Sequence, residues 1–174
     1  MATLYRRLLG SAFDGMPDVL RSFHDRPEGG KACGEVRVTR GTTRLARTIA
    51  TLAGFPPEGD SMPLTVEVLV SGERESWIRS FGSHIFSTAQ WVKNGRLVER
   101  SGAMNMVFEV KASSRGMHFR SISASMVFVP LPMALVPRAE VDAIGDEAGW
   151  SIDVRIEAAG VGPLVRYQGR VRPV

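Results

Sequence analysis

The sequence contains little that would cross-link the chain or anchor it in a membrane. Cys33 is its only cysteine, so no internal disulfide can form and nothing in the sequence requires an oxidising compartment. No apolar run reaches the ~18 residues of a membrane-spanning helix. The first residues also lack the cationic and apolar regions of a secretory signal. We therefore expect a cytoplasmic protein without a membrane span.

Motifs of common catalytic and cofactor sites are also absent. The sequence has no Gly-x-Gly-x-x-Gly after a strand, no phosphate-binding loop and no Gly-x-Ser-x-Gly. Its histidines, His24, His84 and His118, show no metal-ligand spacing, and we expect neither a metal nor a cofactor. His24 falls at the end of a predicted helix, where we interpret it as a structural or surface residue. Any catalysis would have to use carboxylate, arginine or tyrosine.

Charge of one sign is not concentrated anywhere in the chain. The 22 lysines and arginines exceed the 18 acidic residues by four, and the arginines are scattered. A nucleic-acid-binding protein needs basic charge clustered on one face, so we expect no nucleic-acid partner. With 174 residues, 44% of them hydrophobic, we expect one globular domain over residues 1–174, large enough for a proper core.

Four alternating stretches between Leu64 and Val110 organise the rest of the sequence. They predict antiparallel strands over residues 64–70, 75–81, 85–92 and 96–100. Asn94-Gly95 separates the last two, and this dipeptide favours a type I′ hairpin turn because both central residues need positive φ.

Further strands and helices are predicted on either side of this centre. Strands are predicted over residues 31–40, 104–112, 117–130, 135–144, 150–159 and 164–171. In the stretch 117–130, Ala124 and Met126 alternate with Phe119, which predicts opposite faces. Helices are predicted within residues 3–25 and between Gly41 and Gly54, where Leu45, Ile49 and Leu52 share one face.

This order predicts a mainly β, α+β fold. We expect an antiparallel meander of about nine strands curled into a barrel or half-barrel, because a flat sheet of that size would leave long open edges. Two or three helices of the N-terminal half would cover one face or mouth. A two-layer sandwich is the alternative. The prolines at 130, 132 and 137 predict an edge, a corner or a bulge.

Polar side chains on the predicted strands are the candidates for a site. Arg79 shares a face with Glu75, Trp77 and Phe81, and a guanidinium stacks on aromatic rings and binds carboxylates. Arg79 is therefore a predicted anchor for an anionic head group. If Glu99 points inward, it could pair with Arg79 or act as a general base. Equally, the two could form a cross-strand pair on a solvated outer face.

Flexible apolar side chains are frequent in the second half of the chain. They are Met104, Met106, Met117, Met126 and Met133, with Phe108 and Phe128. Methionine adapts to varied apolar ligands, and small antiparallel barrels often hold one ligand. The predicted ligand-binding residues are Trp77, Arg79, Phe81, Glu99, Met104, Met106, Phe108, Arg166 and Tyr167.

Short motifs along the chain carry a resemblance to a known family. They are LYRRLLG at 4–10 with AF at 12–13, His24, WIRSFG at 77–82 with FS at 86–87, LVERSG at 97–102, LPM at 131–133 and VRYQG at 165–169. Together they resemble a bacterial family catalogued only as domain of unknown function 4166, over nearly the whole chain. The resemblance implies no activity. It implies that members are free-standing domains or extensions of chains with a nucleotide-cofactor-binding domain.

Three functions are compatible with these observations. The first is a binding module that holds a hydrophobic or lipid-like small molecule in an apolar cavity. The second is a cofactor-free isomerase, cyclase or hydrolase that uses Arg79 with Glu99 and Tyr167 as candidate catalytic residues. The third is an interaction partner of an oxidoreductase supplied by another chain. The sequence does not predict an oligomeric state.

Overall fold

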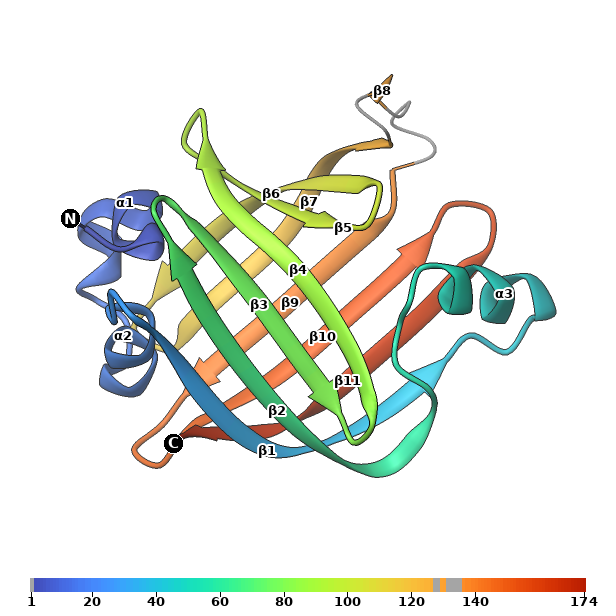
Figure 1. Ribbon diagram of the computed structural model, residues 1–174, viewed down its shortest axis with the longest axis horizontal. Helices are drawn as coiled ribbons and strands as arrows, with labels where there is room; N and C mark the ends of the chain where they lie inside the picture. The colour runs from blue at the N-terminus through green and yellow to red at the C-terminus, as the bar shows by residue number, and fades with distance from the viewer. Residues whose placement is uncertain (1, 127–128, 131–135) are drawn as a thin grey trace.

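The computed structural model describes residues 2–126, 129–130 and 136–174, and within these residues eleven strands form one sheet (Figure 1). The strands are β1 (Gly29–Arg40), β2 (Gly59–Ser71), β3 (Arg74–Phe81), β4 (His84–Lys93), β5 (Arg96–Ser101), β6 (Met104–Ser113), β7 (Gly116–Met126), β8 (Val129–Pro130), β9 (Arg138–Gly145), β10 (Trp150–Ala158) and β11 (Gly162–Pro173). The helical elements are α1 (Leu4–Leu9), the 3-10 helix η1 (Gly10–Phe13), α2 (Asp18–His24) and α3 (Arg44–Leu52).

The sheet closes into a barrel. Its order is β6-β5-β4-β3-β2-β1-β11-β10-β9-β7, and β6 also pairs with β7, so ten antiparallel strands form a closed ring. Closure removes the open edges that a flat sheet would present. The predicted meander and barrel are confirmed, and the fold is not a two-layer sandwich. The ten stretches predicted as strands become eleven strands because the predicted stretch 117–130 contains both β7 and the short β8, which pairs with the end of β7.

Local turn chemistry sets the order of the strands. Asn94 has a φ of 52° and Gly95 a φ of 69°, which is the backbone that a type I′ turn requires. The turn joins β4 to β5 as the sequence predicts. Pro130 lies in β8 at the margin of the barrel, which agrees with an edge position, whereas the motif at 131–133 lies outside the described residues.

The helices divide between the two ends of the barrel (Figure 1). At the α1–α2 end, Tyr5 from α1 and Leu20 and Phe23 from α2 are buried in the main core. At the α3 end, His84 Nε2 lies 2.9 Å from the carbonyl oxygen of Gly54, and this hydrogen bond joins the β3–β4 hairpin to the loop after α3.

No helix of the described residues is long and apolar enough to cross a bilayer.

Helix α3 packs through its small residues. Ala46 and Ala50 are buried against Leu164 of β11, whereas Leu45 is 58% exposed and Leu52 is 83% exposed. Of the predicted face, Ile49 is partly buried against this cluster, whereas the two leucines are not part of the buried face. Small side chains occupy the buried face because the chain lies close to β11 just before the helix begins. A Cβ on Gly41 would lie 2.0 Å from the carbonyl oxygen of Pro163.

A bulge in the β6–β7 pair changes the inward face of β7. The register shifts between Val107 and Phe108 of β6. As a result, Phe119 and Met126 both line the interior, although their spacing predicts opposite faces. The bulge lets β7 contribute inward apolar side chains on both sides of the irregularity.

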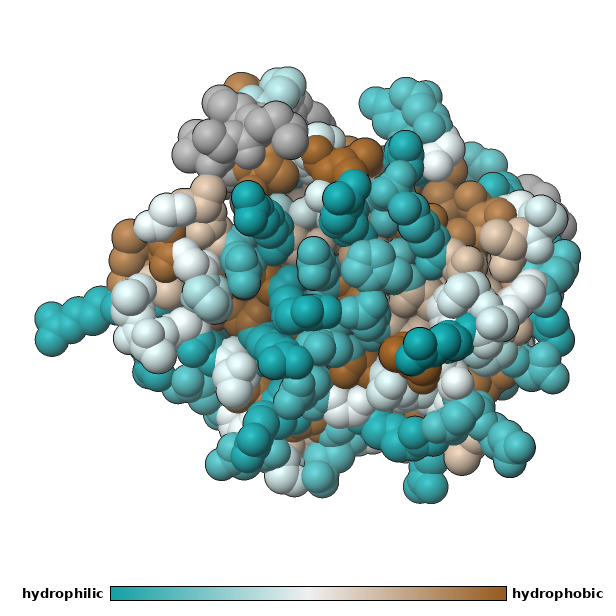
Figure 2. Space-filling model, turned by 180° about the vertical axis from the view of Figure 1, so that it is seen from behind, coloured by the Kyte–Doolittle hydropathy of each residue, from teal (hydrophilic) through white to brown (hydrophobic). Residues whose placement is uncertain are grey.

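The outer wall of the barrel is polar. Seen from behind, it carries mostly hydrophilic residues (Figure 2). Ion pairs connect neighbouring strands there, for example Arg155 with Asp142 at 2.6 Å and Arg96 with Glu109 at 3.1 Å. The core therefore lies inside the barrel and under the helices.

Both ends of the chain lie at the α1–α2 end (Figure 1). The backbone N–H of Val174 donates to the carbonyl oxygen of Lys31 at the start of β1, at 2.9 Å. The first and last strands are also neighbours in the ring, because β1 pairs with β11.

Candidate ligand-binding site

A cavity of about 490 Å³ lies inside the barrel. Most of its wall is apolar, and it includes Phe86, Met104, Met106, Phe108, Trp150 and Ile156. These side chains come from β4, β6 and β10 and point inward by the alternation of each strand. The volume lies in the range of about 300–1,000 Å³ that is typical of small-molecule sites.

The cavity reaches the surface at the α3 end. Leu52 and Met126 line it and are 83% and 45% exposed, and the β5–β6 turn at Gly102 and Ala103 also borders it. At the other end the lining residue Tyr5 is 1% exposed. A ligand would therefore enter beside α3 and travel toward α1 and α2.

A chain of hydrogen bonds crosses one side of the cavity. Arg79 donates from Nη1 to Thr88 Oγ1 at 2.9 Å and from Nη2 to Glu99 Oε1 at 3.3 Å. Gln90 Nε2 donates to the other carboxylate oxygen of Glu99 at 3.2 Å. The hydroxyl of Tyr5 donates to Gln90 Oε1 at 2.9 Å. The chain thus connects helix α1 with β3, β4 and β5.

Arg79 keeps its charge inside the barrel because Glu99 balances it. Burial opposes the charge and is the largest single influence, but Glu99 together with Tyr167 and Tyr5 outweighs it, so the pKa of Arg79 lies above its ordinary value. The guanidinium carbon lies 5.3 Å from the ring centre of Trp77 and 5.9 Å from that of Phe86. The expected position between two aromatic rings is thus present, with Phe86 of the neighbouring strand in the place predicted for Phe81.

Tyr167 places a hydroxyl group beside this pair. Burial raises its pKa, while Arg79 lowers it and Glu99 raises it. Phe81, which is 1% exposed, packs edge-on against Tyr167 with 5.2 Å between ring centres. Phe81 therefore supports the wall of the cavity from behind. Among the described residues the Tyr167 hydroxyl has no hydrogen-bond partner, so it remains available to a ligand.

Aromatic rings surround His24 where the cavity meets α1 and α2. Its ring centre lies 4.1 Å from that of Tyr5, 5.3 Å from that of Phe23 and 5.7 Å from that of Trp77. Burial lowers the pKa of His24 to about 3, so the imidazole is neutral at physiological pH. The residue is a buried part of the cavity wall, so the surface alternative is wrong.

Arg166 lies apart from the other predicted site residues. It points to the outer wall and donates two hydrogen bonds to Asp153, at 2.9 and 2.8 Å. The reason is the alternation of β11, since Tyr167 occupies the inward position next to it. The prediction of Arg166 as a ligand-binding residue of the cavity is therefore wrong.

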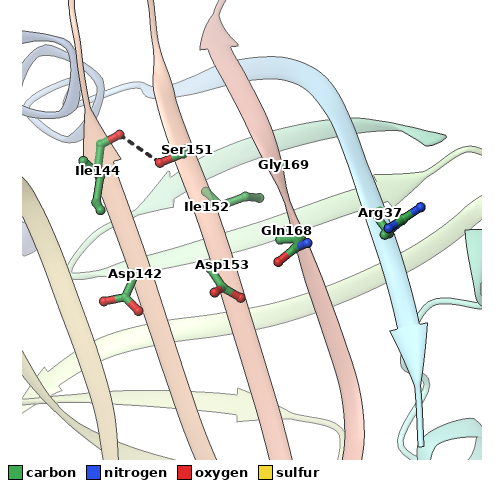
Figure 3. Close-up of a pocket in the computed structure, with 8 residues that line it drawn as sticks. All are labelled: Arg37, Asp142, Ile144, Ser151, Ile152, Asp153, Gln168 and Gly169. Carbon is green, nitrogen blue, oxygen red and sulfur yellow. Dashed lines mark hydrogen bonds between the residues drawn. The ribbon is translucent and has the colours of Figure 1, made fainter. Parts of the chain in front are cut away.

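A shallow depression on the same outer wall is a second hollow among the described residues. Figure 3 shows Arg37, Gln168, Asp153 and Asp142 side by side across β1, β11, β10 and β9. Asp142 and Asp153 are already paired with arginines of neighbouring strands. We therefore place the candidate site in the internal cavity.

The sequence identified part of this site and missed the rest. Trp77, Arg79, Glu99, Met104, Met106, Phe108 and Tyr167 all line the cavity, as do Met117 and Met126. Phe128 and Met133 lie outside the described residues. Thr88 and Gln90 were missed, although they share the inward face of β4 with Phe86 and stand out there as polar residues. Tyr5 carried no such signal, because only tertiary packing brings α1 to the barrel.

The polar groups are arranged for hydrogen bonding more than for proton transfer. Glu99 accepts hydrogen bonds from both Arg79 and Gln90, so both of its carboxylate oxygens already have partners. Tyr167 holds its proton more firmly than an ordinary tyrosine because its pKa is raised. A general acid would need a pKa nearer to neutrality than that of Tyr167.

Fold and cavity together define a closed antiparallel barrel with an internal space of ligand size, a class that can enclose a small molecule. The family model described as Domain of unknown function (DUF4166) matches residues 16–171, so the chain belongs to this family, as its motifs predict. No curated protein and no solved structure matches the chain. The family description gives no activity, so the functional argument starts from the cavity.

Proposed function

We propose that this protein is a binding module that holds a hydrophobic, lipid-like small molecule inside the barrel. The observation that carries the proposal is the cavity of about 490 Å³ with its apolar lining and its opening beside α3. Protein interiors are normally packed to high density, and an empty space forfeits contacts on every side of its lining. An apolar ligand would restore those contacts.

The hydrogen-bond chain supports a ligand with one polar part. Arg79, Glu99 and the Tyr167 hydroxyl lie on a mostly apolar wall, and a few fixed polar groups in an apolar pocket usually orient a ligand. Arg79 and Glu99 neutralise each other, so a buried anionic head group would meet Glu99 as well as Arg79. The cavity therefore favours an uncharged polar group over the anionic one that Arg79 alone suggests.

Ligand extraction and dye binding test this proposal. Native mass spectrometry of freshly purified protein should reveal a bound apolar molecule, and organic extraction should release it. The neutral dye N-phenyl-1-naphthylamine should bind with a rise in fluorescence. Met106→Trp would fill the cavity and should weaken dye binding by about tenfold or more, which corresponds to about 1.4 kcal/mol.

A matched variant on the same strand controls for nonspecific binding. Asn105 lies next to Met106 on β6 and faces away from the cavity by alternation. Asn105→Trp adds the same indole to the outer wall and should leave dye binding unchanged. Protein that carries no ligand and binds no dye, or an equal effect of both variants, would contradict the proposal.

A further inference from the structure

The imidazole of His24 is an unused polar group at the inner end of the cavity. The residue is 8% exposed and lines the cavity, and neither ring nitrogen has a hydrogen-bond partner among the described residues. In those residues, Arg155 Nε is the only fully enclosed side-chain nitrogen or oxygen without a partner. The ring nitrogens of His24 are therefore not fully enclosed by protein, and His24 is one of the residues that line the cavity.

An unpartnered imidazole in this position is costly unless something hydrogen-bonds to it. Burying a polar group without a partner is unfavourable, and native proteins generally supply one. The rings of Tyr5, Phe23 and Trp77 contact the imidazole through their faces and edges, which are not hydrogen-bond partners for its nitrogens. The Tyr5 hydroxyl already donates to Gln90. The partner must therefore come from the contents of the cavity.

The chemistry of the ring specifies that partner. A neutral imidazole has one nitrogen that donates and one that accepts a hydrogen bond. A hydroxyl group matches both roles, because it donates and accepts. A carboxylate only accepts and would bring an uncompensated charge into an apolar end of the cavity, whereas an ammonium group only donates.

We propose that the inner end of the cavity is a hydroxyl-binding subsite, in which His24 hydrogen-bonds the leading hydroxyl of an uncharged apolar alcohol. The alcohol enters beside α3 with its hydroxyl first and leaves its hydrocarbon part against Met104, Met106 and Phe108. This assignment rests on the proposed binding function and adds the chemical class of the ligand and its orientation.

Competition between matched ligands tests the subsite. 1-Decanol, n-undecane and decanoate have similar length and differ in the terminal group, and each is used to displace N-phenyl-1-naphthylamine. In the natural protein, 1-decanol should compete about five- to tenfold better than n-undecane, as expected for one neutral hydrogen bond, and decanoate should compete worst. His24→Phe keeps an aromatic ring without nitrogens and should abolish the preference for the alcohol while n-undecane competes as before.

Two further variants separate the subsite from general effects on the cavity. His24→Gln keeps a donor and an acceptor and should retain part of the preference for the alcohol. Met104→Leu alters the wall against which the hydrocarbon part lies, so it should shift the competition of 1-decanol and of n-undecane by the same factor and leave the preference for the alcohol in place.

The experiment has a second readout that needs no variant. In ¹⁵N spectra of the histidine rings, 1-decanol should shift the nitrogens of His24 and n-undecane should not. If both ligands bind and neither His24→Phe nor the spectra distinguish them, the hydroxyl subsite is wrong and the binding function stands. If neither the dye nor any ligand binds, the binding function fails and the subsite with it.

Discussion

The buried side chains of this barrel differ in how they tolerate burial. Arg79 remains charged because Glu99 faces it, and the pair has further hydrogen bonds to Thr88 and Gln90. His24 has no such compensation and stays neutral, since burial lowers its pKa to about 3. Each group thus adopts the protonation state that its surroundings make least costly.

His24 should make the stability of the protein depend on pH. The folded state has a pKa of about 3 at this residue and the unfolded chain the ordinary value of 6.5, so between these values the unfolded state binds more protons. Stability should therefore fall as the pH is lowered from 6.5 toward 3, with a slope of up to about 1.4 kcal/mol per pH unit from this residue. Urea unfolding at a series of pH values measures the slope.

A variant isolates the contribution of this histidine from those of the other acidic and basic groups. His24→Phe should unfold with a shallower pH dependence between 6.5 and 4, and the two proteins should differ least in slope above pH 7. Equal slopes in both proteins throughout this range would show that His24 titrates normally in the folded state.

The orientation of helix α3 is set by the narrow space between the helix and β11. Its N-cap Thr43 accepts a hydrogen bond from the backbone N–H of Ala46 at 3.1 Å, which fixes the start of the helix. The buried face then consists of small residues because β11 lies close by. Leu52 is consequently left exposed beside the opening of the cavity.

Enlarging the small face of α3 should destabilise the protein. Ala50→Leu forces extra methylene and methyl groups against Leu164 and should cost about 1–3 kcal/mol, as overpacking usually does. Leu45→Ala removes a side chain that is 58% exposed and should change stability by less than about 0.5 kcal/mol. Urea unfolding compares the two, and a larger loss for Leu45→Ala would indicate that the leucine face is the packed one.

The pairing of β1 with β11 joins the first and last strands of the chain and closes the ring. Gly169 lies on β11 opposite Val36, and a Cβ there would lie 2.0 Å from the carbonyl oxygen of Glu35. Backbone atoms rather than flexible side chains fill this space. The closeness of these two strands therefore depends on the absence of a side chain at position 169.

Gly169→Ala should weaken this junction. The strands must separate to admit the methyl group, and we expect a loss toward the upper end of the usual range of about 0.5–3 kcal/mol. Hydrogen exchange should show the amides of β1 and β11 losing protection before those of β3 and β4. Gly15→Ala is the control, since its added Cβ would have a nearest contact of 3.7 Å. Similar effects of both substitutions would contradict this account of the junction.

The features of the barrel that depend on neighbouring residues in the sequence, such as strand faces and turns, could be predicted from the sequence. Alternation identified the inward residues of β3, β5 and β6, and Asn94-Gly95 identified a turn. Closure could be predicted only as the consequence of many adjacent strands, since the first and last strands, β1 and β11, are brought together by the accumulated curvature of the whole sheet.

The site was predictable only in part for the same physical reason. Arg79 and Glu99 could be paired from strand order, whereas Arg166 depended on which face of β11 turned inward. His24 and Tyr5 come from helices whose position is set by packing across the barrel, and hydrophobic periodicity does not report this position. The β7 bulge and the alanine face of α3 similarly depend on the space between elements.

The shared location of the two chain ends has a practical consequence for handling the protein. Val174 and helix α1 lie opposite the α3 opening (Figure 1). An affinity tag, a surface linker or a fused domain attached at either terminus would extend away from the opening. Immobilised or fused forms of the chain should therefore exchange small molecules with solvent as freely as the untethered one.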